Sequence, residues 1–201
     1  LRIKLEYKYV DDIGNDKGHA CSQAGETVTL SGGKSYVCAS ADVITKAKRD
    51  YLQKLMTYTV EKIGSLLKVV QVEGPLKLDA RTYDPFLVLE DDSDGYKLFE
   101  DTDMAVYVTA RPAGSNDVYA TGRTISTDRN GRPILGNINW NPSLLTPPSS
   151  DDDNKNIIDG MYRGIAFHEM LHALGFSSGM FRAFRDASGE PWEDVIVTKT
   201  L

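Results

Sequence analysis

The segment from Asn156 to Leu174 constrains the fold of this chain more than any other part of the sequence. Its apolar residues recur at spacings of three and four, which predicts one long helix with a buried face. His168 and His172 stand four residues apart within it. At ~100° per residue, their imidazoles lie about 40° apart on the helix surface, one turn above each other. The fold must therefore bury one face of this helix while two imidazoles point the same way.

The spacing of these two histidines favours a metal site. Two imidazoles on one side of a helix can reach one tetrahedral zinc ion. Glu169 lies about 100° from His168, beside the two ligands, where a general base would stand. Zinc lowers the pKa of a bound water toward ~7, and a neighbouring carboxylate can take its proton as the water attacks a carbonyl. The bare pattern also arises from two surface histidines, but the apolar helix around it favours a catalytic zinc site.

A tetrahedral catalytic site needs a third protein ligand, and histidine does not supply it within this chain. The compact metzincin pattern would place a histidine six residues after His172, where this sequence has Ser178. His19 is the only other histidine, and it lies far upstream in a segment rich in loop residues. That context favours an ordinary loop histidine rather than a ligand.

A glutamate ligand is the other possibility. A thermolysin-like site uses a glutamate about twenty residues further on, and Glu190 and Glu193 stand near that distance. Gly189 and Pro191 argue against the helix that such a glutamate needs. The third ligand is therefore expected beyond Leu201, in which case this chain is a fragment.

The rest of the sequence predicts an α+β fold with a mixed, twisted sheet and a long backing helix. That helix is expected from about Ala41 to Ile63, capped by Ser40 and stopped at Gly64. Residues 11–40 and 73–103 are expected to be mostly loop, and Asn130-Gly131 predicts a turn. The expected strands are Leu1–Val10, Leu66–Val72, Met104–Ala110, Val118–Ser126 and Ile134–Trp140.

Composition excludes some function classes. The 201 residues carry a net charge of −6 with no basic stripe, which gives little support for nucleic-acid binding. No window is long and apolar enough for a membrane span, so any membrane association would come through regions outside this chain. The two cysteines, Cys21 and Cys38, can form a disulfide or remain two thiols.

The run His168-Glu169-Met170-Leu171-His172-Ala173-Leu174-Gly175-Phe176-Ser177 resembles the leishmanolysin family of zinc metalloproteases. That family is similar to metzincins but has a long insertion between the glycine and its third histidine, which accounts for Ser178. The resemblance continues upstream in family order through segments His19–Cys21, Val37–Ala39, Lys48–Asp50, Val69–Val72, Thr102–Val108 and Gly131–Asn139.

The resemblance implies a secreted or surface zinc endopeptidase that cleaves proteins or peptides with one catalytic Zn²⁺. It implies that His168 and His172 are zinc ligands, that Glu169 is the catalytic base and that Gly175 is a turn residue. It also implies a disulfide between the two cysteines. Residues 1–178 would form a zincin-like N-terminal catalytic subdomain, and residues 179–201 would begin the following subdomain.

In zincins an edge strand above the active-site helix pairs with extended substrate. Order and composition favour the strand that contains Gly136, Asn137, Ile138 and Asn139 for this role. Two other functions remain open at this point: a non-catalytic binding or structural protein that keeps a protease fold, and a peptidase that uses a glutamate as third ligand.

Overall fold

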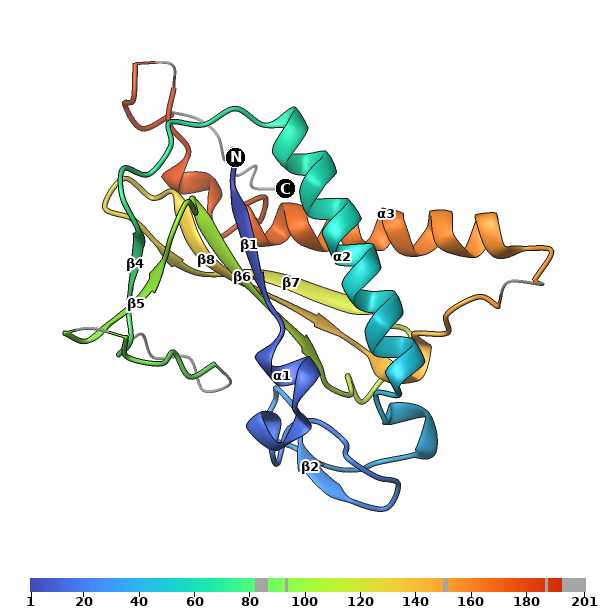
Figure 1. Cartoon of the computed structure of the whole chain (residues 1–201). Helices are drawn as coiled ribbons and strands as arrows, with labels where there is room; N and C mark the ends of the chain where they lie inside the picture. The colour runs from blue at the N-terminus through green and yellow to red at the C-terminus, as the bar shows by residue number, and fades with distance from the viewer. Residues whose placement is uncertain (82–86, 93, 150–151, 187, 193–201) are drawn as a thin grey trace, which may run out of the picture.

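The computed structural model describes residues 1–81, 87–92, 94–149, 152–186 and 188–192. Its centre is a four-stranded sheet in the order β1-β6-β8-β7 (Figure 1). Strands β1, β6 and β8 are parallel, whereas β7 runs antiparallel to β8 at one edge. Their bounds are β1 (Ile3–Glu6), β6 (Met104–Ala110), β7 (Ala120–Thr127) and β8 (Pro133–Trp140). The expected mixed sheet and α+β class are confirmed.

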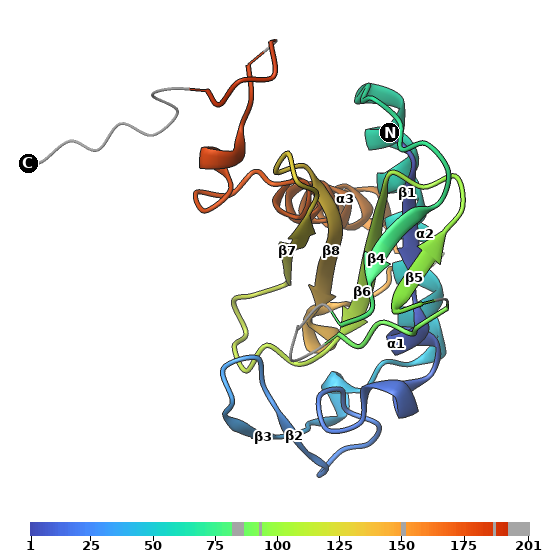
Figure 2. The same ribbon diagram turned by 90° about the vertical axis from the view of Figure 1, so that its left-hand side faces the viewer.

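Two long helices cover one face of this sheet, and a hairpin covers part of the other (Figure 2). The helices are α2 (Lys46–Leu66) and α3 (Lys155–Ala173), and the hairpin consists of β4 (Leu76–Asp79) and β5 (Tyr96–Phe99). Strand β6 explains the layering, because all seven of its residues are buried and successive side chains point to opposite faces. Met104, Val106 and Val108 join the core under the helices, while Ala105 and Tyr107 join the core under the hairpin.

The predicted strand Leu66–Val72 is wrong, because α2 continues through Gly64 to Leu66. Gly64 does not stop the helix. It marks a close contact instead, since a Cβ there would lie 2.8 Å from the carbonyl oxygen of Leu1. The residues after the helix are held without a strand partner: Leu67 accepts from the N-terminal amine, and Val70 accepts from the guanidinium of Arg132.

The start of α2 also differs from the prediction. Thr45 caps it by accepting a hydrogen bond from the N–H of Lys48, and Ser40 instead begins a short 3₁₀ helix, η2 (Ser40–Asp42). The predicted strand Leu1–Val10 is shorter than expected, because β1 gives way to the short helix α1 (Lys8–Asp11). Hairpin β4–β5 lies in a stretch expected to be loop.

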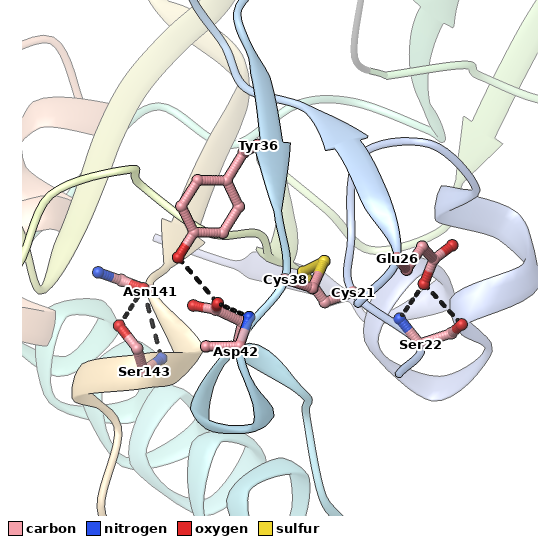
Figure 3. Close-up of a disulfide and its surroundings, with 9 residues drawn as sticks. Cys21, Ser22, Glu26, Tyr36, Cys38, Asp42, Asn141 and Ser143 are labelled. Carbon is pink, nitrogen blue, oxygen red and sulfur yellow. Dashed lines mark hydrogen bonds between the residues drawn. A yellow bond between two sulfur atoms is a disulfide. The ribbon is translucent and has the colours of Figure 1, made fainter. Parts of the chain in front are cut away.

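A small disulfide-linked region lies below the sheet in Figure 1 and contains η1 (Ile13–Asp16), β2 (Thr27–Thr29) and β3 (Ser35–Val37). Cys21 and Cys38 are bonded there, which confirms the implied disulfide (Figure 3). Both cysteines pack against Val28 in a separate core cluster. The carboxylate of Asp42 accepts from the hydroxyl of Tyr36 and from the N–H of Ala39, which ties the hairpin to η2. The bridge thus supports a region with little apolar core of its own.

Two other short elements complete the order. Helix η3 (Pro142–Leu144) follows β8, and η4 (Phe181–Ala183) follows α3, with a single bridge between Arg185 and Pro191. None of the helices in the described ranges combines the length and apolar character that a membrane crossing requires.

The carboxylate of Asp103 is fully buried and links three segments of the chain through hydrogen bonds and charge. It accepts hydrogen bonds from the backbone N–H and guanidinium of Arg2 and from the N–H of Val72, and the guanidinium of Arg132 lies 3.7 Å away. Desolvation raises the pKa of Asp103, but these hydrogen bonds and the charge of Arg2 outweigh it and hold the pKa well below its usual range.

This carboxylate makes stability depend on pH. Because its pKa is lower in the folded chain than the ~3.9 of an unfolded aspartate, its contribution is present above about pH 4 and is lost as the pH falls further. Asp103→Asn should lower the free energy of unfolding by about 2 kcal/mol at pH 7. In urea titrations between pH 2 and 7, the free energy of unfolding should fall less steeply toward acid pH in the variant than in the parent. An equally steep fall in both proteins would contradict this role of Asp103.

Candidate metal centre

The two histidines of the sequence motif lie in the last two turns of α3, where the helix crosses under the sheet edge. The helix ends in a Schellman turn. The N–H of Gly175 donates to the carbonyl of His172, and the N–H of Phe176 donates to the carbonyl of Leu171. Gly175 has a φ of 95°, which a side chain would disfavour, so it takes the turn position expected of it. The turn folds the chain back over the end of the helix.

This turn orients one imidazole. The carbonyl oxygen of Phe176 lies 2.7 Å from Nδ1 of His172 and accepts its proton. The Nε2 atom of that ring is then the one with a free lone pair, and it lies 3.0 Å from Nε2 of His168. The ring planes are nearly perpendicular, at 89°. Two imidazole nitrogens therefore converge on one point outside the helix.

The convergence fits a zinc ion. Two nitrogens bound to a tetrahedral zinc at ~2.0–2.1 Å lie about 3.3 Å apart, close to the separation of the two Nε2 atoms. Zinc-bound histidines usually donate the other ring N–H to a carbonyl or carboxylate, as His172 does. His168 is exposed and His172 half-buried, so the pair is open to an ion from solvent.

Glu169 lies beside this pair but points toward the sheet. It is 9% exposed, and its main chain lies against Gly122 in β7. Burial raises the pKa of Glu169, while the nearby backbone N–H of Gly122 and the side chains of His168 and His172 act in the opposite direction. The carboxyl group is thus partly desolvated and next to both imidazoles.

Small residues let α3 approach the sheet closely. A Cβ at Gly122 would overlap the carbonyl oxygen of Glu169, and a Cβ at Gly136 would lie 3.1 Å from the Cβ of Ala173. The hydroxyl of Thr124 donates to the carbonyl of Ala173 at 3.0 Å, which satisfies an end group of the helix. Strand β7 therefore fixes the height and rotation of the helix that carries the histidines.

The expected edge position of Gly136, Asn137, Ile138 and Asn139 is wrong. These residues lie in β8, which is paired with β6 on one side and with β7 on the other. Their backbone groups serve two ladders. The side-chain amide of Asn137 donates to the carbonyl of Tyr107, and that of Asn139 donates to the carbonyl of Arg111. The strand with a free edge is β7, residues Ala120–Thr127.

Sequence reasoning found β7 as a strand but did not place it. The turn at Asn130-Gly131 shows that β7 and β8 are neighbours, since Asp128 and Arg132 bracket it with backbone hydrogen bonds. The turn does not indicate which of the two strands pairs with β6. The glycine at position 122, in an otherwise β-rich run, was the available signal of a close approach.

No third ligand joins the pair within the described part of the chain, where no group of three or more His, Cys, Asp or Glu is placed to hold a metal. His19 lies in the disulfide-linked region, with Nδ1 3.1 Å from the carbonyl of Thr29. Glu190 is exposed in the turn after η4, where its backbone bonds to Asp186. Glu193 lies outside the described residues.

Comparisons with known proteins indicate one protein family. A family model for peptidase family M8, described as leishmanolysin, matches residues 1–189. A leishmanolysin of Leishmania major is 30% identical over 196 residues, which cover 95% of this chain and 30% of that protein. A leishmanolysin-like peptidase of Caenorhabditis elegans is 35% identical over 96 residues, which cover 46% of this chain and 13% of that protein.

A third relative carries a different name. A ciliated left-right organizer metallopeptidase of Xenopus laevis is 29% identical over 138 residues, which cover 67% of this chain and 17% of that protein. This chain thus spans less than a third of the length of the Leishmania major relative and a still smaller share of the other two.

Proposed function

Because this chain belongs to the leishmanolysin family, we propose that it carries the first part of the catalytic unit of a zinc-dependent endopeptidase. His168 and His172 are two of the zinc ligands, and Glu169 is the general base. One observation carries the proposal: two imidazole nitrogens 3.0 Å apart, one of them oriented by a backbone carbonyl.

The chemistry follows from the positions of these three side chains. When bound, the zinc ion would activate a water molecule and polarise the carbonyl of the scissile peptide bond. Glu169 then accepts the proton of the attacking water and delivers it to the leaving amine. Partial burial suits this role, because it raises the pKa of Glu169 toward the range in which a carboxylate can both take and release a proton.

We assign the substrate strand to β7 instead of β8. An extended peptide can add to a sheet only where backbone N–H and C=O groups are unused, and β7 is the edge next to α3. Such pairing would lay the peptide along the edge of the sheet, near the two imidazoles. The substrates are then proteins or peptides in extended conformation.

The third ligand is proposed to lie in polypeptide that follows residue 201 in a longer protein. The Leishmania major relative is long enough to hold such a segment. Residues 1–178 would form the zincin-like N-terminal catalytic subdomain, and residues 179–201 would begin the next one. The described residues after 178 turn back on the sheet, since a Cβ at Gly131 would lie 2.8 Å from the Cβ of Ala183.

We propose that the protein acts outside the cell or at its surface. The disulfide supports this, because disulfides persist in oxidising compartments. Any attachment to a membrane would reside in other parts of a longer polypeptide.

Zinc binding tests the proposed ligands. The chain alone should bind zinc weakly, because two ligands form part of a site, and a polypeptide extended to the length of the relatives should bind one zinc tightly. His172→Ala in the extended protein should lower zinc affinity by more than about 100-fold, the upper range for loss of a supporting residue. Competition with a zinc chelator measures this.

Two substitutions serve as controls for the ligand assignment. His19→Ala and Glu190→Ala should leave zinc affinity unchanged. A large loss with Glu190→Ala would favour the peptidase with a glutamate ligand, and unchanged affinity with His172→Ala would overturn the site. An extended protein that binds zinc but cleaves no peptide would favour the non-catalytic alternative.

A further inference from the structure

A cavity of about 350 Å³ lies between α2 and α3, the two helices that cross in Figure 1. It is separate from the histidine pair, which lies further along α3. Its lining combines aromatic rings with charged side chains of both helices, and includes Tyr51, Lys54, Tyr58, Lys155, Asp159 and Arg163. A cavity of this size can hold a small organic molecule.

Helical spacing brings these charged side chains to the cavity. Lys54 and Tyr58 are four residues apart on α2. Lys155, Asp159 and Arg163 follow the same spacing on α3. Residues four apart lie on one face of a helix, so each helix presents one row of side chains to the space between them. The described lining has three cations and one carboxylate, although the chain as a whole has a net charge of −6.

The cations of this cavity are not used by the ion pairs of the fold. Within the described ranges, Lys54, Lys155 and Arg163 have no carboxylate oxygen within 4.0 Å. Lys155 also stands in the first turn of α3, where the positive end of the helix dipole disfavours a cation. The stability of the helix therefore does not explain this lysine.

Arg163 lies over an aromatic ring. Its guanidinium carbon is 4.5 Å from the centroid of the Tyr58 ring, and Nζ of Lys62 is 5.8 Å from the same centroid. The ring of Phe167 meets the Tyr58 ring edge-on, with 6.4 Å between the centroids. Stacking fixes the plane of a guanidinium and leaves the N–H donors at its edge, where they match two oxygens of a tetrahedral oxyanion.

The carboxylate in the cavity wall is held by a neighbour. Oδ1 of Asp159 accepts a hydrogen bond from the hydroxyl of Tyr51 at 2.7 Å. Burial raises the pKa of Tyr51, and this hydrogen bond acts in the same direction, so the hydroxyl keeps its proton. Of the acidic residues close by on α2, Asp50 pairs with Lys46, and Glu61 lines a neighbouring hollow. The charge of Asp159 opposes an anion in the cavity, but the three cations outnumber it.

We propose that this cavity binds a small phosphate or sulfate ester. Lys54, Lys155 and Arg163 bind the oxyanion, and the rings of Tyr51 and Tyr58 contact the organic part of the ester. Phosphate and sulfate groups share the charge and the tetrahedral oxygens that such donors recognise, and aromatic rings add attraction for an organic group. The inference goes beyond the proposed function and requires no zinc.

The first test is a calorimetric titration of the chain with phenyl phosphate at neutral pH and low ionic strength. One molecule should bind per chain, and inorganic phosphate should bind at least about threefold more weakly because it lacks the ring. Tighter binding of phenyl phosphate than of phenyl sulfate assigns a phosphate ester, and binding of phenyl sulfate that is at least as tight assigns a sulfate ester. Binding of neither ester, or equal binding of inorganic phosphate, would overturn the proposal.

Single substitutions locate the bound anion. Lys155→Ala and Arg163→Ala should each weaken binding of the preferred ester by about tenfold or more, because each removes a charged hydrogen-bond donor. Lys34→Ala removes an exposed lysine between β2 and β3 and should change the affinity by less than about twofold. Urea unfolding of each variant checks that the fold is retained. An equal loss with Lys34→Ala and Lys155→Ala would overturn the site, since the attraction would then come from the charge of the whole chain.

A further substitution tests the site by a gain of affinity, which unfolding cannot imitate. Asp159→Asn keeps an acceptor for the hydroxyl of Tyr51 and removes the opposing charge. Binding of the preferred ester should become about two- to fivefold tighter. Unchanged or weaker binding in a folded Asp159→Asn variant would contradict an anion bound beside this carboxylate.

Discussion

Glu169→Ala should reduce peptide cleavage by about 10²- to 10⁴-fold while one zinc ion stays bound, in a polypeptide that contains the third ligand. The carboxylate is the only acidic side chain between the two imidazoles in the sequence, and it lies at their side in the structure. Zinc affinity should change little, because the proposed ligands are His168 and His172. Cleavage of a quenched fluorescent peptide and metal analysis of the same sample measure the two effects.

Two comparisons make this prediction specific. Glu190→Ala changes an exposed carboxylate outside the site and should leave cleavage within about twofold of the parent. His168→Ala should remove zinc and cleavage together. Full activity in Glu169→Ala with zinc bound would end the proposed mechanism, and loss of zinc in that variant would instead make Glu169 a ligand.

Asp16→Ala should lower the free energy of unfolding by about 3–5 kcal/mol. Asp16 in η1 and Arg111 after β6 form a buried pair, with side chains 1% and 11% exposed and a shortest distance of 2.7 Å. Arg111 Nε also donates to both carboxylate oxygens, at 3.0 and 2.8 Å. Burial raises the pKa of Asp16, because it disfavours the charged carboxylate. The intact pair is therefore expected to stabilise the fold little more than apolar residues would. Removal of one partner lowers stability much more, because the buried guanidinium of Arg111 then loses this carboxylate.

A surface pair provides the matched control. Lys46 and Asp50 lie one turn apart on α2, and their side chains are 79% and 53% exposed. Asp50→Ala should change the free energy of unfolding by less than about 1 kcal/mol, because solvent screens such a pair. Chemical denaturation of both variants gives the comparison. A loss below about 1 kcal/mol for Asp16→Ala would show that Arg111 does not depend on this carboxylate.

The two predictions concern different ends of the sheet. The pair of Asp16 and Arg111 fastens the disulfide-linked region to the end of β6, whereas Glu169 lies in α3 against β7. Asp16→Ala should affect stability, and Glu169→Ala should affect the rate of the reaction. Separate outcomes would show that the fold and the site have independent supports in this chain.

Elements with a clear local signal were predictable from the sequence. The expected helix Asn156–Leu174 corresponds to α3, and the expected strands Met104–Ala110 and Ile134–Trp140 correspond to β6 and β8. Their apolar pattern extends over the whole element, and turn residues lie at their boundaries. The extent of α2 was not predictable in this way, because Gly64 is kept for its contact with the carbonyl of Leu1 and not for a turn. Hairpin β4–β5 was not predictable either, because its two strands are short and lie among acidic turn residues. Each strand is too short for a clear alternation of apolar and polar residues.

The sequence by itself determined that two imidazoles stand one turn apart with a carboxylate beside them, because helix geometry converts a spacing of four residues into a common direction. It could not determine which strand closes the sheet above that helix. Only the tertiary structure placed β7 at the edge and Gly122 against Glu169, since strand order and close approach depend on contacts between residues far apart in the chain.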